Sequence, residues 1–99
     1  MNDDEFEWDD AKASSNYAKH GVTFEAARDV FKDSSAIEQI DDRHDYGEER
    51  WTILGVARGR LPLVAYTMRN DCIRIISARA AEPCEQREYH EQNACDDQA

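Results

Sequence analysis

The stretch from Ile73 to Arg79 combines strand-forming residues with two arginines, whose planar guanidinium groups suit phosphate. Alternation places Ile73 and Ile75 on one face of a strand and Arg74 on the other. An unpaired charge in mid-strand is costly if it is buried. Arg74 is therefore either paired with a nearby acid on an open sheet face or displayed to a phosphate. Arg79 ends the strand, where functional groups are common, at a junction with a helix.

A second candidate group ends the first predicted helix, at Lys19-His20-Gly21. Histidine is the side chain that titrates near pH 7. The negative end of a helix dipole favours its charged form. Lys19 and His20 therefore serve either as simple caps of the helix or as functional groups. In the functional interpretation, His20 is a general acid or base, or a cation that binds phosphate.

Other reaction types find no support in the sequence. Asp41, Asp42, His44 and Asp45 are close together, but their spacing matches no standard metal loop, and the glycine and terminal glutamate of an EF-hand are absent. The nucleophile elbow, the Walker loop, the zinc-protease motif and the dinucleotide-binding glycines are also missing. We expect neither a metal nor a cofactor.

Cysteine usage and hydropathy predict a cytoplasmic protein. Cys72, Cys84 and Cys95 form no C-x-x-C pair and are interpreted as free thiols in a reducing compartment. The longest strongly apolar stretch, residues 61–66, is far shorter than the roughly 20 residues that a helix needs to cross a bilayer. The acidic N-terminus does not resemble a secretory signal. We therefore expect no membrane association.

The charges are unevenly distributed along the chain. The net charge is −10, from 12 basic and 22 acidic residues, which disfavours binding to DNA by the isolated chain. Residues 50–79 nevertheless contain six arginines and a single acid, Asp71, for a net charge of +5. This segment, the Arg band, consists of Arg50, Arg58, Arg60, Arg69, Arg74 and Arg79.

The N-terminal half predicts one strand followed by two helices. Alternation of apolar and acidic residues predicts a short strand over residues 6–8. Asp9 or Asp10 caps a helix that Gly21 ends, and Thr23 caps a second helix. Residues 36–40 are predicted to form an edge strand, and residues 41–49 a polar loop.

The C-terminal half predicts three meandering strands, over residues 51–57, 61–68 and 72–78. If Asn70-Asp71 is a two-residue turn, Thr67 faces Arg74; a three-residue turn instead brings Tyr66 opposite Arg74. A last helix begins at Glu82-Pro83 and runs to about residue 92, and residues 93–99 form a frayed tail. The chain is thus predicted to be a single α+β domain, residues 1–99, with a small antiparallel sheet packed against helices.

These pieces, taken in order, resemble the BrnT toxins of type II toxin–antitoxin systems. In the N-terminal half the matching residues are Phe6-Glu7-Trp8-Asp9, Lys12, Asn16, Lys19-His20-Gly21-Val22-Thr23-Phe24-Glu25-Ala26-Ala27 and Val30-Phe31. In the C-terminal half they are Gly47-Glu48-Glu49-Arg50-Trp51, Ile53-Leu54-Gly55, Val64-Ala65-Tyr66-Thr67, Ile73-Arg74-Ile75-Ile76-Ser77-Ala78-Arg79, Glu85 and Tyr89. Each piece alone is weak, but together they cover most of the chain.

The resemblance implies a RelE-like fold and a ribonuclease that cuts RNA without a metal. It also implies a cognate antitoxin of the ribbon-helix-helix class, similar to BrnA, which neutralises the toxin in a hetero-oligomer. That complex represses its own operon, and DNA is contacted through the antitoxin. We expect the antitoxin to lay acidic or apolar side chains over the Arg band.

For an RNA substrate, the 2′-OH attacks the adjacent phosphate, and the enzyme supplies a base, an acid and cations. On this interpretation Arg74 and Arg79 bind the phosphate, and His20 is the base or acid. Tyr66 stacks on a base or donates a proton. Arg50 is a further cation at the catalytic site, and Glu49 is its partner or a base. The residues expected to bind substrate are Lys19, Arg58 and Arg60.

One region departs from the family pattern. The family usually has Lys straight after Ser-Ala-Arg and then a strongly basic helix. Here Ala80 replaces that Lys, and the helix that follows is acidic. An acidic helix beside an RNA site repels phosphates. The alternative function is therefore a catalytically weak or decayed toxin that acts as a non-enzymatic partner or corepressor of its antitoxin. A free-standing acidic adaptor is a third interpretation.

Overall fold

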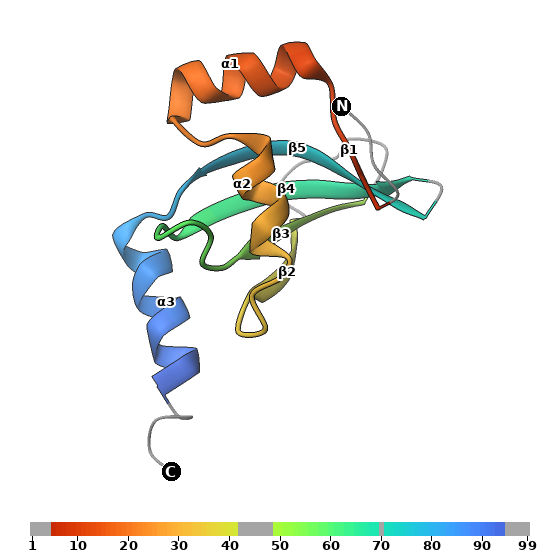
Figure 1. Cartoon of the computed structure of the whole chain (residues 1–99). Helices are drawn as coiled ribbons and strands as arrows, with labels where there is room; N and C mark the ends of the chain where they lie inside the picture. Colours follow the sequence, from red (N-terminus) through yellow and green to blue (C-terminus); the bar gives the residue numbers. More distant parts are fainter. Residues whose placement is uncertain (1–4, 42–48, 70, 95–99) are drawn as a thin grey trace.

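The computed structural model describes residues 5–41, 49–69 and 71–94 (Figure 1). Strands and helices form an α+β fold, as the sequence predicted. The elements are β1 (Phe6–Glu7), α1 (Asp10–His20), α2 (Phe24–Val30), β2 (Ile37–Asp41), β3 (Arg50–Leu54), β4 (Pro62–Arg69), β5 (Cys72–Ala80) and α3 (Pro83–Ala94). The strand order across the sheet is β1-β5-β4-β3-β2, so β2 is an edge strand, as expected.

The sheet is mixed rather than wholly antiparallel. The strands β2 to β5 pair antiparallel with their neighbours, but β1 pairs parallel with β5. The parallel register sets Phe6 beside Ile73 and Glu7 beside Arg74. The chain can make this pairing because α1 and α2 separate β1 from the meander, and a parallel pair needs a long crossover connection.

Local capping explains where the first two helices begin and end. The Asp9 side chain accepts hydrogen bonds from the backbone N–H groups of Ala11 and Lys12, at 2.8 and 3.1 Å. Gly21 ends α1 with a φ of 70°, a left-handed conformation that suits glycine. Thr23 caps α2 by accepting from the N–H of Ala26 at 3.1 Å. These three predictions from the sequence are confirmed.

Asn16 ties α1 to the sheet. Its side chain is buried and makes three hydrogen bonds, two of them as donor, to the carbonyl oxygens of Val22 and Ala78 at 2.9 Å. Its carbonyl oxygen accepts from the N–H of Ala78 at 3.0 Å. The amide therefore pairs with the edge of β5 as a neighbouring strand would, and it holds the end of α1 against that strand.

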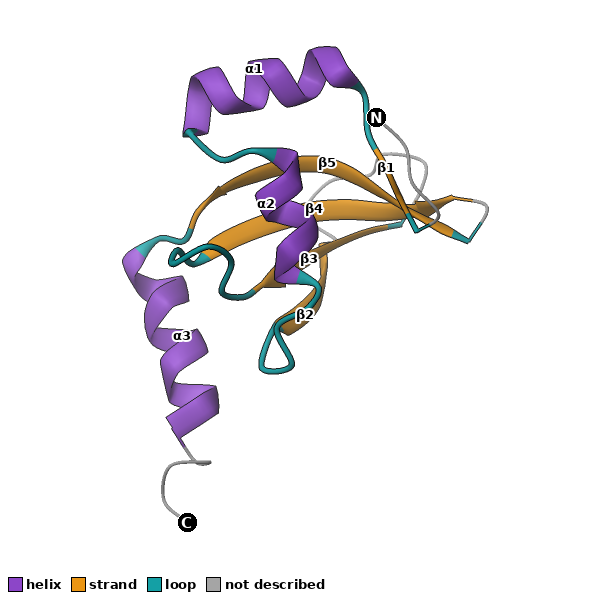
Figure 2. Ribbon diagram, in the orientation of Figure 1, coloured by secondary structure: helices purple, strands orange, loops and turns teal. Residues whose placement is uncertain are grey.

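Two helices cover one face of the sheet, and α3 lies at one end of the molecule (Figure 2). The main core fills the space between the sheet and α1 and α2. Its fully covered members include Phe24, Val30, Val64 and Ile75. A smaller cluster joins α3 to the sheet through Leu54, Ala81 and Tyr89.

Some boundaries differ from those predicted. β3 ends at Leu54 rather than at residue 57, because Ala57 pairs with Arg60 in a separate tight turn. Residues 42–48 and 95–99 lie outside the described residues, and with them Asp42, His44, Asp45 and most of the predicted tail. Asn93, expected to be frayed, belongs to α3 and donates to the carbonyl of Tyr89 at 2.8 Å.

None of the helices in the described part of the chain is both long and apolar enough to cross a bilayer. Two cysteines are described, Cys72 and Cys84, and both are free thiols, as the sequence predicted for them. Cys72 is half-buried in β5, whereas Cys84 is exposed near the start of α3.

Candidate active site

Arg74 and Arg79 lie on the same face of the sheet, although they are five positions apart in the sequence. In a regular strand, residues five apart point to opposite faces. A bulge in β5 reverses the alternation, because the register with β4 shifts between the two arginines. Arg74 then lies beside Thr67 and Arg79 beside Leu63. Because Thr67 pairs with Arg74 and Tyr66 with Ile75, the first of the two predicted registers is confirmed.

This face, which we call the outer face, is turned away from α1 and α2. The inner face carries Val64 and Tyr66 in β4, with their β5 neighbours Ala78 and Ile75, all in the main core. The intervening residues of both strands point the other way. Thr67 and Leu63 are four residues apart in β4, so the Cα atoms of the two arginines are about 13 Å apart. They are therefore suited to different phosphates of one RNA strand.

A carboxylate contacts Arg74. Its Nη1 lies 2.9 Å from Oε2 of Glu7, which the parallel pairing of β1 brings beside it. Both side chains are about a quarter exposed, at 27% and 28%. The sequence left two interpretations of Arg74 open, and the structure shows the ion pair on a sheet face. The guanidinium has five N–H donors, so this pair does not exhaust its capacity to bind phosphate.

A second carboxylate holds Arg79. Its Nη1 and Nη2 donate to Oε1 and Oε2 of Glu85, both at 2.9 Å. The Nη2 atom of Arg79 also lies 3.8 Å from Oε1 of Glu82. The hydrogen bonds to Glu85 raise the pKa of Arg79 above its usual value, against the opposing effect of burial. Glu85 also accepts from the N–H of Glu82 at 2.8 Å, as the last partner of a capping box does, so one side chain both caps α3 and covers Arg79.

Arg50 lies at the Arg74 end of the outer face. It begins β3, one residue before Trp51, which packs against the inner core. Thr67 lies in β4, between β3, which carries Arg50, and β5, which carries Arg74. Its hydroxyl donates to the carbonyl of Glu49 at 2.6 Å. Arg50 and Arg74 therefore flank Thr67 at a separation of about 10 Å, two strand spacings.

Tyr66 lies on the inner face, so the sheet separates it from the arginines. Its ring packs against Phe31 and stacks on Trp51, at centroid distances of 5.0 and 6.0 Å. The hydroxyl donates to the Glu38 carboxylate. Burial, together with this hydrogen bond, raises the pKa of Tyr66 far above its usual value. The hydroxyl is therefore a poor proton donor in this arrangement.

The other cationic residues predicted for the site lie at or near the C-terminal end of α1. His20 is the last residue of α1, and it and Lys19 are exposed. Arg60 donates from Nη1 to the carbonyl of Gly21 at 3.1 Å, so the turn between β3 and β4 meets the residue after His20. Arg58 lies in the same turn. We call Lys19, His20, Arg58 and Arg60 the end cluster.

A cavity of about 250 Å³ lies beside the end cluster. Its walls include Gly21, Arg58, Arg60 and Ala80. The Arg58 Nε donates to the Asp29 carboxylate at 2.9 Å, which orients that guanidinium. The Arg58 backbone has a φ of 53°, which marks a tight turn. The turn thus contributes two arginines to the lining of the cavity.

The structure therefore divides the predicted site residues into three groups. Arg50, Arg74 and Arg79 lie on the outer face, the end cluster lies where α1 ends, and Tyr66 lies on the inner face. Sequence reasoning missed the partners Glu7, Glu38 and Glu85. Glu7 alternates with buried Phe6 and Trp8, which was a signal of its outward direction. Nothing local marked which of the many acids would meet which arginine.

The chain was also compared with known proteins. The sequence profile of the ribonuclease toxin BrnT of type II toxin–antitoxin systems matches residues 8–85. The chain belongs to the BrnT family. No curated protein matched the chain. The BrnT profile runs from Trp8 to Glu85, so it spans the end cluster and every arginine of the outer face.

Membership in the BrnT family gives the cationic groups a chemical context. The family is one of ribonuclease toxins, and RNA presents a phosphate at every nucleotide. A type II toxin also has a protein antitoxin as its partner. Within the described residues, no three His, Cys, Asp or Glu side chains are grouped so that they could hold a metal ion.

Proposed function

We propose that this BrnT-family chain is an endoribonuclease that cuts RNA by attack of the 2′-OH on the adjacent phosphate, without a metal. Such a reaction needs a base for the 2′-OH, an acid for the leaving 5′-oxygen and cations around the charged intermediate. At the end cluster the chain supplies one group for proton transfer and three cations. His20 is the base or acid there, and Arg58, Arg60 and Lys19 bind the phosphate.

The contact between Arg60 and the Gly21 carbonyl carries this assignment. It brings the Arg60 guanidinium to the residue next to His20, so that a cation suited to phosphate lies beside the end of α1 that carries the imidazole. The exposure of His20 leaves its imidazole accessible to a substrate. The neighbouring cavity supports the same location, because Arg58 and Arg60 both line it beside Gly21.

The arginines of the outer face, across the sheet from the cavity, offer further contacts to the same RNA strand. Arg79, and then Arg74 with Arg50, follow one another over a distance of about 13 Å. That spacing suits contacts to successive phosphates better than joint binding of one phosphate. In this proposal Arg79 contacts the phosphate nearest the cut, and Arg74 and Arg50 hold the strand. Tyr66 has no role in proton transfer, because its hydroxyl donates to Glu38 on the inner face.

We also propose that the protein antitoxin is a ribbon-helix-helix protein similar to BrnA, and that the two chains form a hetero-oligomer. The net charge of −10 supports assigning the contacts with operator DNA to the partner. A mobility-shift assay of the isolated chain tests this part. Operator DNA should migrate unshifted at physiological salt until antitoxin is added, and a shift by the chain alone would contradict the assignment.

The acidic start of α3 favours a second candidate function, that of a non-enzymatic corepressor. Glu85 occupies two donors of Arg79, and Glu7 occupies one donor of Arg74. A chain whose phosphate-binding arginines stay covered would bind its antitoxin and strengthen operator binding without cutting RNA. The two functions differ in one measurement, the cleavage of RNA by the chain alone.

The decisive experiment incubates purified chain with RNA in EDTA at low salt, beside a metal-independent ribonuclease as positive control. The proposal expects cleavage with 2′,3′-cyclic phosphate ends, and expects the His20→Ala variant to lose it. His90→Ala is the matched control, because His90 is also an exposed helical histidine. RNA that stays intact at high protein concentration would reject the enzyme and favour the corepressor. Cleavage abolished by EDTA would reject the metal-free mechanism.

A further inference from the structure

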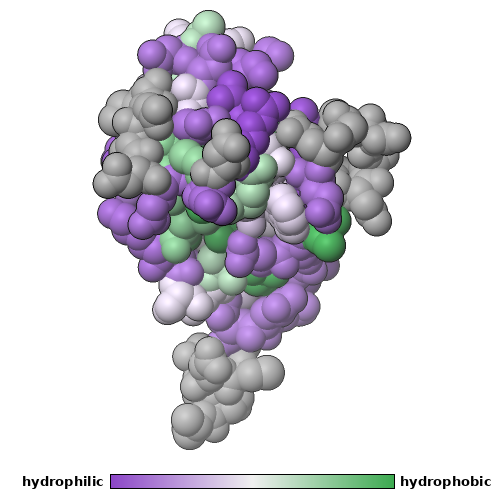
Figure 3. Space-filling view, turned by 90° about the vertical axis from the view of Figure 1, so that its right-hand side faces the viewer, coloured by the Kyte–Doolittle hydropathy of each residue, from purple (hydrophilic) through white to green (hydrophobic). Residues whose placement is uncertain are grey.

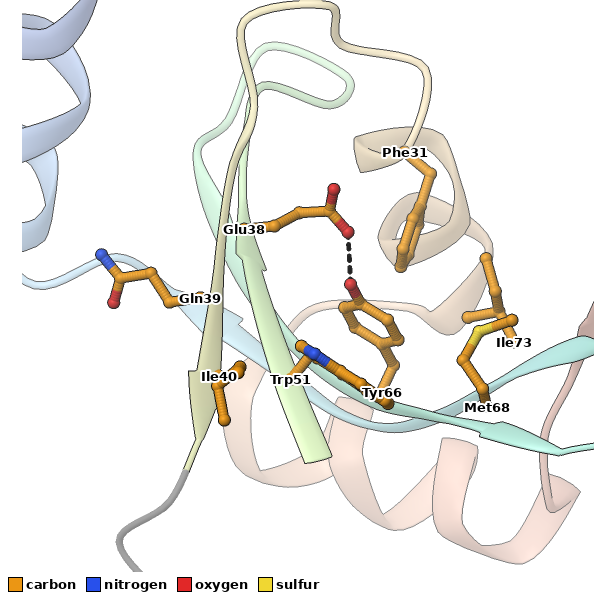
Figure 4. A pocket seen from close by; sticks show the side chains of 8 residues that line it. All are labelled: Phe31, Glu38, Gln39, Ile40, Trp51, Tyr66, Met68 and Ile73. Atoms are coloured by element: carbon orange, nitrogen blue, oxygen red, sulfur yellow. Dashed lines mark hydrogen bonds between the residues drawn. The ribbon is translucent and has the colours of Figure 1, made fainter. Parts of the chain in front are cut away.

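A second concave site lies on the inner face, away from the cationic groups. This pocket has a volume of about 440 Å³, and Figure 4 shows the side chains that line it. Phe31 directly follows α2, and the other lining side chains come from the four strands β2 to β5. The lining residues are Phe31, Glu38, Gln39, Ile40, Trp51, Tyr66, Met68 and Ile73. The catalytic proposal uses none of them. We call it the inner pocket.

The inner pocket exists because the helices cover only part of the sheet. α1 packs mainly on β5, and α2 mainly on β4 and β5, so the inner side of β2 and β3 is less covered near Ile40 than at Ile53, which is buried in the main core. Two apolar side chains at the pocket are consequently exposed, Ile40 at 63% and Met68 at 47%. The side of the molecule drawn in Figure 3 shows apolar surface among hydrophilic side chains. Removal of such surface from water favours association.

The chemistry of the lining favours a cationic and apolar occupant. Six of the eight lining residues are apolar or aromatic, and the one charged residue is Glu38. Figure 4 shows the Glu38 carboxylate pointing into the pocket toward the Tyr66 hydroxyl, whereas Gln39 points away. The carboxylate has further acceptor capacity beyond that one hydrogen bond. An Arg or Lys side chain from a partner can therefore pair with it above the aromatic rings.

The width of the inner pocket suits a helix. Its lining runs from Ile40 in β2 to Ile73 in β5, across three strand spacings, or about 14 Å. An α-helix with its side chains is about 10–12 Å in diameter. One amphipathic helix can therefore lie in the pocket with its apolar face on Trp51 and Met68.

We propose that the inner pocket is the docking surface for an amphipathic helix of the protein antitoxin, with a basic residue of that helix against Glu38. This inference rests on the proposed function, since it takes the partner to be the antitoxin of a type II toxin. It adds a surface on the opposite side of the sheet from the arginines of the outer face. The antitoxin can thus hold the toxin by an anchor that is separate from the RNA site.

RNA is the competing occupant, since a base can stack on Trp51. The charges argue against it. None of the described residues that line the inner pocket is basic, and a nucleotide would bring its phosphate close to the Glu38 carboxylate. The outer face and the end cluster offer cations instead. RNA binding in the inner pocket is therefore an outcome that the experiment must detect.

The test measures, by titration calorimetry, the affinity of the chain for the purified protein antitoxin encoded beside it. Ile40→Asp and Met68→Asp each place a charge in the proposed interface, at positions exposed enough to leave folding intact. Each change should weaken binding at least 30-fold. Val56→Asp is the matched control, because Val56 is 46% exposed and lies outside the inner pocket. Its affinity should stay within threefold of that of the unaltered chain.

Two further variants test the role of the negative charge on Glu38 in binding the antitoxin. Glu38→Gln keeps an acceptor for the Tyr66 hydroxyl but removes the negative charge, and it should weaken binding about tenfold. Glu38→Lys reverses the charge and should weaken binding more than Glu38→Gln does. Thermal unfolding of each variant confirms that the fold is intact. Equal affinities for all the inner-pocket variants and the Val56→Asp control would overturn the proposal.

The same variants separate this inference from the proposed function. RNA cleavage by each chain is measured without antitoxin. If the Ile40→Asp and Met68→Asp variants cut RNA more slowly but bind antitoxin normally, the pocket takes RNA and the docking proposal is wrong. If the unaltered chain cuts no RNA but shows the expected pattern of affinities, the ribonuclease proposal fails and the docking surface stands. If the unaltered chain does not bind the antitoxin, both the partner assignment and the docking surface are wrong.

Discussion

Glu85 and Arg79 form a bidentate ion pair, in which each terminal nitrogen of the guanidinium lies 2.9 Å from one carboxylate oxygen. Bidentate pairs of this kind combine two charge-assisted hydrogen bonds with a fixed geometry. The pair places the first turn of α3 over an arginine that the proposed mechanism needs for phosphate. A substrate phosphate must therefore compete with a carboxylate that is already in place.

The first prediction concerns this competition. Glu85→Gln removes the negative charge and should raise the rate of RNA cleavage several-fold, because Arg79 is then available to phosphate. The change should also lower the free energy of unfolding by about 1 kcal/mol, since Glu85 also caps α3. Glu91→Gln is the control, with the same change of charge at an exposed position in the same helix. Equal cleavage rates for the two variants would show that Glu85 does not shield the arginine.

The second prediction compares the two arginines of the outer face. Arg79→Ala should lower kcat/KM about 100-fold, the usual effect of removing one contact to a charged transition state. Arg74→Ala should act mainly through KM, by about tenfold, because that residue contacts a more distant phosphate. Kinetics and melting temperature are measured on the same preparations. If Arg74→Ala lowers only the melting temperature, Arg74 is a structural partner of Glu7.

The third prediction concerns the proton transfer at the end of α1. His20→Ala should reduce cleavage at least 100-fold, within the range that general acid–base catalysis contributes. The melting temperature should change little, because His20 is exposed. His90→Ala should leave the rate unchanged. A fully active His20→Ala variant would move the acid or base to another residue.

The fourth prediction concerns Asn16, the buried amide between α1 and β5. Asn16→Ala removes three hydrogen bonds and leaves the Ala78 backbone N–H unsatisfied in the core. The free energy of unfolding should fall by about 2–4 kcal/mol, as buried donors and acceptors lose their partners. Ser15→Ala, an exposed change on the same helix, should have almost no effect. Urea denaturation measures both, and similar midpoints would contradict the assigned role.

The fifth prediction concerns stability in acid. Burial acts to raise the pKa of Asp33, but hydrogen bonds from Tyr89, Val56 and Ser35 outweigh it, so the folded-state pKa lies below 3.8. A carboxyl group with a lowered folded pKa stabilises the fold above its unfolded pKa. That stabilisation is lost as the pH falls through the folded value.

Tyr89→Phe tests this prediction, because the Tyr89 hydroxyl donates to Asp33 at 2.6 Å. The change should lower the free energy of unfolding by about 1 kcal/mol at pH 7. It should also make stability fall less steeply below pH 4. Tyr17→Phe, at an exposed tyrosine, is the control. Unfolding is followed between pH 2 and 7, and parallel curves for the unaltered chain and Tyr89→Phe would show that the hydroxyl does not tune the carboxyl group.

Local signals predicted the helices well. Asp9, Gly21 and Thr23 act on residues within one turn of themselves, so their roles can be predicted from neighbouring positions alone. The two-residue turn was also among the predicted alternatives. The parallel pairing of β1 was not predicted, because it joins residues 67 apart and no local pattern marks its partner.

The site was predicted only in part, for the same reason. The arginines and His20 were selected by residue type and position, and the profile match places them within a ribonuclease family. Their grouping depends on the bulge in β5, which shifts Arg79 to the face of Arg74. No glycine marks that bulge in the sequence. The ion pairs with Glu7 and Glu85 depend in turn on how β1 and α3 pack, and those contacts are not local.

The parallel pairing of β1 with β5 also determines when the protein can fold during its synthesis. β1 is translated before β5, its neighbour among the described strands, and two helices and three strands lie between them in the sequence. A partial chain on the ribosome therefore holds an unpaired first strand and lacks the strand that carries Arg74 and Arg79. Because long-range strand pairing must await both partners, the sheet closes late. The face that carries Arg74 and Arg79 is thus completed only after β5 has been made.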